Sequence, residues 1–149
     1  MLLKREYPDQ PLVGVGGVTI SKGSVLLIRR AQEPLRGEWS IPGGMLHLGE
    51  ALKDGVRREL KEETGLRVEP VSVLGVFDRI FYGEESDRVK YHYVLVDYLC
   101  CLLSGELCAS SDASQARWVS RERISGFHLN KETKALVERA FQKEEQVRL

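Results

Sequence analysis

The sequence has little cysteine. Its three cysteines, Cys100, Cys101 and Cys108, are too few and too close together to form a disulfide framework. No CxxC pair or matching histidine spacing accompanies them, which argues against zinc. We therefore expect buried free thiols, which are typical of proteins in a reducing cytoplasm.

The sequence also lacks a long apolar run and an excess of charge. No run approaches the roughly 20 apolar residues of a membrane span, and residues 1–11 lack the apolar core of a secretion signal. We expect a soluble cytoplasmic protein with no membrane contact. The 22 basic residues equal the 22 acidic ones, which argues against a stable nucleic-acid partner. A length of 149 residues fits a single domain, residues 1–149.

The spacing of apolar residues predicts strands interspersed with two helices. Residues 12–20 and 25–30 are expected to form a hairpin with a loose turn, and the second strand to be buried on both faces. An irregular loop follows over residues 31–44. The strand-rich segments are residues 71–82, 91–103 and 116–119, and residues 130–146 form the last helix. Asp97 lies in the most apolar of these strands, so it must face a cavity, an edge or a partner.

Residues 44–66 carry the clearest pattern. They predict a loop followed by a helix of three to four turns that ends at Gly65. At about 100° per residue, the helix has one charged arc and one apolar arc. Three glutamates lie outside the charged arc, on the side shared with Gly55: Glu59, Glu62 and Glu63.

The position of these glutamates is unfavourable for stability. Like charges three or four residues apart repel by roughly 0.2–0.5 kcal/mol per pair. Acids in the last turn also face the negative end of the helix dipole, which costs about 0.3–1 kcal/mol each. A divalent cation would turn this repulsion into binding, and an oxygen-only set suits Mg²⁺ or Mn²⁺. A glutamate-rich surface helix is the alternative, and helical placement alone does not separate the two.

Nine positions in this stretch match a known motif without departure: Gly44, Glu50, Arg58, Glu59, Leu60, Glu62, Glu63, Gly65 and Leu66. They resemble the Nudix box. The resemblance implies an α/β protein with an α/β/α sandwich around a mixed central sheet. It also implies a hydrolase of nucleoside diphosphates linked to another moiety, with Mg²⁺ or Mn²⁺ as cofactor.

The same resemblance implies roles for individual residues. Glu59 and Glu63 would be the principal metal ligands, with Glu62 as a third. A backbone carbonyl of Gly43 or Gly44 would complete the metal shell, because the family uses a carbonyl just before or at the start of the box. Catalytic roles then fall on these acids together with an orienting ion pair: Glu50, Arg58, Glu59, Glu62 and Glu63.

The general base and the substrate contacts are less defined. Glu59 or Asp112 could serve as the base, and Glu84, Glu85 and Asp87 are further candidates on a loop. Gly44 lies where substrate would bind. Arg29 and Arg30 point to opposite faces of a strand end, so at most one is expected to reach a phosphate. Trp39 is a candidate to stack on a base, although packing in the core is the alternative.

The substrate itself is open. The overall sequence is similar to those of family members that act on ADP-ribose or nucleotide sugars, and we favour that substrate class. A nucleoside triphosphate pyrophosphohydrolase is the alternative within the family. A catalytically silent domain that binds a nucleotide as a sensor is the alternative outside enzymes. A homodimer is a further expectation, since family relatives are often dimers.

Overall fold

The computed structural model describes residues 4–85, 87–109 and 113–147. Its elements follow the order expected from the sequence, with two short strands added in the segment that was expected to be irregular. In chain order they are β1 (Leu12–Ser21), β2 (Ser24–Arg30), β3 (Trp39–Ser40), β4 (Gly43–Met45), α1 (Leu52–Thr64), β5 (Arg67–Tyr82), β6 (Val89–Ser104), β7 (Ala113–Ser120), the 3₁₀ helix η1 (Arg121–Phe127) and α2 (Lys131–Val147).

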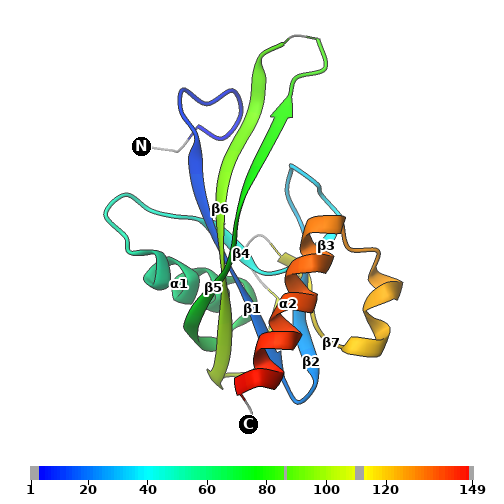
Figure 1. Cartoon of the computed structure of the whole chain (residues 1–149). Helices are drawn as coiled ribbons and strands as arrows, with labels where there is room; N and C mark the ends of the chain where they lie inside the picture. Colours follow the sequence, from blue (N-terminus) through cyan, green and yellow to red (C-terminus); the bar gives the residue numbers. More distant parts are fainter. Residues whose placement is uncertain (1–3, 86, 110–112, 148–149) are drawn as a thin grey trace.

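The strands form a mixed sheet between two helices. Its order is β3-β2-β1-β6-β5, with β4 paired to β1 and β7 paired to β2. The β1–β6 pair is parallel and the β5–β6 pair is antiparallel. Helices α1 and α2 cover opposite faces (Figure 1): Tyr98 and Cys100 of β6 pack with α1, whereas Leu99 packs with α2. The predicted α/β class and mixed-sheet sandwich are confirmed.

The β1–β2 hairpin closes more tightly than predicted. Ser21 pairs with Ser24, so only Lys22 and Gly23 form the turn. Both have positive φ angles, 51° and 78°, which is the backbone of a two-residue hairpin turn that follows the twist of its strands. The expectation of a loose turn is wrong. The prediction that β2 is buried on both faces is confirmed, because residues 25–28 are all buried.

The helix ends and the thiols show which local predictions hold. Gly65 ends α1 with a left-handed φ of 76°, and Asn130 caps α2 by accepting a hydrogen bond of 2.8 Å from the Thr133 amide. Cys100 is a buried free thiol, but Cys101 and Cys108 are exposed. The prediction of burial is wrong for these two. In the described part of the chain, no helix is long and apolar enough to cross a membrane.

Helix α1 packs directly on the backbone of β1. Val56 and Leu60 are fully buried against Gly17, where an added Cβ would lie 3.2 Å from each of them. The same Cβ would lie 2.7 Å from the Cys100 sulfur. The absence of a side chain at Gly17 therefore fixes how closely α1 approaches the sheet, and with it the position of the acids of α1.

Gly17→Ala should lower the free energy of unfolding by about 1–3 kcal/mol, because an extra methyl group in a packed core forces its neighbours to move. Gly126→Ala is the matched control, since a Cβ at Gly126 meets nothing within 4 Å. Urea unfolding followed by circular dichroism measures both. Equal stability of the two variants would contradict the close packing at Gly17.

Candidate active site

Helix α1 directs two of its three glutamates inward. Glu59 is 8% exposed and Glu63 is 2% exposed. Residues four apart lie on the same side of a helix, so these two carboxylates share the face toward β4. Glu62 is turned away, and its side chain is 47% exposed. The expectation that all three lie off the solvent face is therefore wrong for Glu62.

Arg58 connects the acids to one another. Its guanidinium donates to both Glu50 carboxylate oxygens at 2.8 and 2.9 Å, to Glu59 Oε1 at 2.8 Å and to Glu62 Oε2 at 3.4 Å. A fifth hydrogen bond of 2.8 Å reaches the Met45 carbonyl. These bonds lower the pKa of Glu50 to about 2 and raise the pKa of Arg58. The predicted Glu50–Arg58 ion pair is confirmed.

The glycines of β4 lie against the inward glutamates. The Gly43 amide donates a hydrogen bond of 2.9 Å to Glu63 Oε1. A side chain at Gly44 would overlap the Glu59 carboxyl group, so only glycine leaves the backbone this close to the acid. The structure thus brings Gly43, Gly44, Glu59 and Glu63 together.

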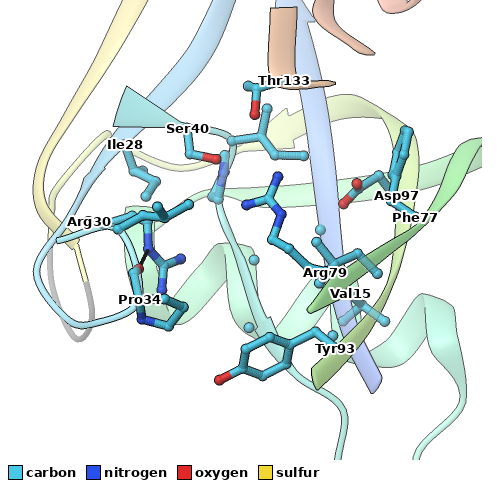
Figure 2. A pocket seen from close by; sticks show the side chains of 18 of the residues that line it. Val15, Ile28, Arg30, Pro34, Ser40, Phe77, Arg79, Tyr93, Asp97 and Thr133 are labelled. Carbon is cyan, nitrogen blue, oxygen red and sulfur yellow. Dashed lines mark hydrogen bonds between the residues drawn. The ribbon is translucent and has the colours of Figure 1, made fainter. Parts of the chain in front are cut away.

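A cavity of about 120 Å³ joins Glu63 to the face of the sheet under α2. Its lining is apolar in part, through Phe77 and Leu136. Figure 2 shows the Arg79 guanidinium, the Asp97 carboxylate and the Thr133 hydroxyl directed toward the same space. The cavity therefore presents both charge types beside an apolar wall.

The charged groups in this cavity differ in the interactions that they make. Arg79 forms an ion pair of 3.1 Å with Glu132. Asp97 is 7% exposed, and burial raises its pKa to about 6 although the charge of Arg79 opposes the shift. Of the three alternatives expected for Asp97, a cavity, an edge or a partner, the structure shows the cavity. Arg79 was not predicted from the sequence. It lies two residues after Phe77 on the same strand, so the two side chains face the same side of the sheet, and this spacing was the available signal.

The residues expected to contact the substrate lie in different places in the structure. Arg30 lines the cavity, donates to the Pro34 carbonyl at 2.8 Å, and has its pKa lowered by burial. Arg29 is exposed and donates to the Gly37 carbonyl at 2.9 Å. Trp39 packs edge-on against Phe127 with 5.0 Å between ring centres, and it is not among the residues that line the cavity.

The acids do not form a ready metal cage. Among the described residues, no group of three or more Asp, Glu, His or Cys side chains is arranged to hold a metal ion. Arg58 engages Glu59 and Glu62, and the Gly43 amide engages Glu63. Of the candidate bases, Asp112 lies outside the described residues. Glu84, Glu85 and Asp87 belong to the link between β5 and β6, away from the cavity lining.

The chain is similar to known proteins over most of its length. The chain is 34% identical to an ADP-ribose pyrophosphatase of Methanocaldococcus jannaschii, over 72% of this chain and 61% of that protein. It is 34% identical to a MutT-like protein of Streptomyces ambofaciens, over 84% of this chain and 78% of that protein.

Solved structures show the same likeness. A MutT NUDIX hydrolase of Burkholderia pseudomallei is 28% identical, with a TM-score of 0.74 over 88% of this chain and 98% of that one. An ADP-ribose pyrophosphatase of Streptococcus suis is 25% identical, with a TM-score of 0.68 over 91% and 92%. The sequence pattern of the NUDIX domain matches residues 10–141. This chain therefore belongs to the Nudix hydrolase family.

Proposed function

We propose that the chain hydrolyses the pyrophosphate bond of a nucleoside diphosphate derivative, with ADP-ribose or a nucleotide sugar favoured. The observation that carries this proposal is that Glu63, a buried acid of α1, lines the same cavity as Arg30 and Arg79. Arginines attract phosphates, and Glu59 lies against Gly44, which also lines this cavity. The likeness to an ADP-ribose pyrophosphatase over 72% of this chain supports the choice of substrate class.

The residues present fit a hard divalent cation by the chemistry of their donors. Glu59 and Glu63 are buried carboxylates, and the bare backbone of β4 borders both. We propose that Glu59, Glu62 and Glu63, with the carbonyl of Gly43 or Gly44, hold Mg²⁺ or Mn²⁺. The ion would neutralise phosphate charge and acidify water.

The side chains of the site act by orientation. Arg58 holds Glu50 with two parallel hydrogen bonds and Glu59 with one, which fixes the direction of both carboxylates. Arg30 offers positive charge to the diphosphate from β2. Glu59 is the candidate proton acceptor that lies at the site.

The remaining expectations are proposals as well. We propose a cytoplasmic location, which the three free thiols support. A single domain and a homodimer also remain predictions.

A nucleoside triphosphate pyrophosphohydrolase and a silent nucleotide sensor are the alternative functions, and a substrate screen distinguishes them. Release of inorganic pyrophosphate from triphosphates would favour the first. Nucleotide binding without turnover would favour the second.

Glu63→Gln should lower hydrolysis of ADP-ribose by at least about a hundredfold in the presence of Mg²⁺ or Mn²⁺, because the variant loses a buried anionic ligand. Phosphatase-coupled phosphate release measures the rate. Glu122→Gln is the control, since Glu122 is exposed in η1. Chelator should abolish wild-type turnover, and activity that survives chelation would contradict a metal-dependent reaction.

Arg58→Lys should lower kcat by about 10- to 100-fold, because an ammonium group cannot reproduce the two parallel bonds to Glu50. Arg57→Lys is a matched control on the next residue of α1, where Arg57 pairs with Asp54 and Glu69 on the outer face. Steady-state kinetics with ADP-ribose compare the two variants. A similar loss in both would show that Arg58 has no special role.

A further inference from the structure

Asp97 is a buried carboxylate that the proposed reaction does not use. It lies in the central strand β6, is 7% exposed and lines the cavity. Within the described residues, no group donates a hydrogen bond to it and no cation lies within ion-pair distance. The carboxylate is open to the cavity, so a ligand there can supply the hydrogen bonds that the protein does not.

The register of the sheet explains why this carboxylate faces the cavity. Gly43 pairs with Gly16, Gly16 pairs with Asp97, and Gly75 pairs with Asp97 from the other side. A side chain at Gly16 would overlap Asp97 Oδ1, so the glycine leaves the carboxylate uncovered. Gly43 and Asp97 are two strand spacings apart, about 10 Å. Asp97 therefore lies about the length of a nucleoside from the amide that binds Glu63.

The groups around Asp97 suit a flat polar ring. Phe77 and Leu136 supply apolar walls, and Arg79 and the Thr133 hydroxyl supply hydrogen-bond donors. Glu132 is held in an ion pair with Arg79. Asp97 thus adds an acceptor beside these donors, and a nucleobase with an amino group and ring nitrogens has the complementary pattern.

We infer that Asp97 determines specificity by accepting a hydrogen bond from the exocyclic amino group of the substrate's nucleobase. The enzyme then favours adenine, guanine or cytosine derivatives over uracil or hypoxanthine derivatives. The inference rests on the proposed function. The pKa of about 6 agrees with it, because the carboxylate is ionised and a strong acceptor at neutral pH.

The test is a double-mutant-type cycle that changes residue 97 of the protein and the amino group of the substrate's nucleobase. Wild type, Asp97→Asn and Asp97→Leu are assayed with two substrate pairs that differ only in the amino group. The pairs are GDP-mannose with IDP-mannose, and ADP-ribose with its 6-unsubstituted purine analogue. In at least one pair, loss of the amino group should lower kcat/KM roughly tenfold or more in wild type and hardly at all in Asp97→Leu. Asp97→Asn, which keeps one carbonyl acceptor, should fall between them.

Asp78→Asn is the matched control, because Asp78 is an exposed acid on β5. It should leave the wild-type preference for the amino group unchanged. An equal loss on all four substrates in the Asp97 variants would overturn the inference while leaving the hydrolase intact. If wild type turns over none of the compounds, the proposed function fails, and the same cycle is decided on dissociation constants measured by calorimetry.

Thermal unfolding gives a second readout. A folded-state pKa raised to about 6 contributes stability below the unfolded pKa of 3.8, and this contribution is lost as pH rises through 6. Asp97→Asn should therefore raise the Tm at pH 7.5 and lose that advantage near pH 4. The charged groups that face Asp97, Arg79 on β5 and Glu132 on α2, are unchanged in the variant. A lower Tm at pH 7.5 would instead indicate a structural role for Asp97.

Discussion

The site depends on one cation, Arg58, which holds several acids together. Without it, the carboxylates of Glu50, Glu59 and Glu62 would place negative charges around one site with no cation between them. Each hydrogen bond from the guanidinium removes part of that repulsion and fixes a carboxylate direction. The bond to the Met45 carbonyl also attaches helix α1 to β4. One side chain thus both stabilises the acid cluster and sets its position on the sheet.

A second constraint is the lack of side chains on the strands at the site. Gly16, Gly17, Gly43 and Gly44 carry no side chains at positions where a methyl group would overlap a neighbour. Helix α1 can therefore approach the strands from one face, and the cavity can reach the backbone from the other. Close packing on one side and open space on the other arise from alternate residues of the same strand, because successive positions point to opposite faces.

Local patterns in the sequence predicted what depends on neighbours along the chain. The end of α1 at Gly65, the inward direction of Glu59 and Glu63, the cap at Asn130 and the buried strand β2 follow from periodicity and capping alone. The start of α1 does not, because the pattern places Glu50 in the first turn and the helix begins at Leu52. The cavity does not, because it depends on which strands pair and in what register. Arg79 and Arg30 lie about 50 residues apart in sequence, and only the pairing of their strands in one sheet places them in one space. Cys101, Cys108 and Glu62 are exposed although positions away from solvent were expected. The periodicity of apolar residues does not show which positions at the border of a buried face are reached by solvent.

The row of glycines beside Asp97 has a consequence for how this protein can diversify. Cavity depth is limited at Gly16 by the size of one side chain, because an added Cβ there would overlap Asp97 Oδ1. A single replacement at Gly16 would shorten the space near Asp97, and the atoms that the new side chain would meet first belong to Asp97, Pro42 and Ile41. The range of accepted molecules can therefore change at Gly16 while the hydrogen bonds from Arg58 to Glu50 and Glu59 are kept.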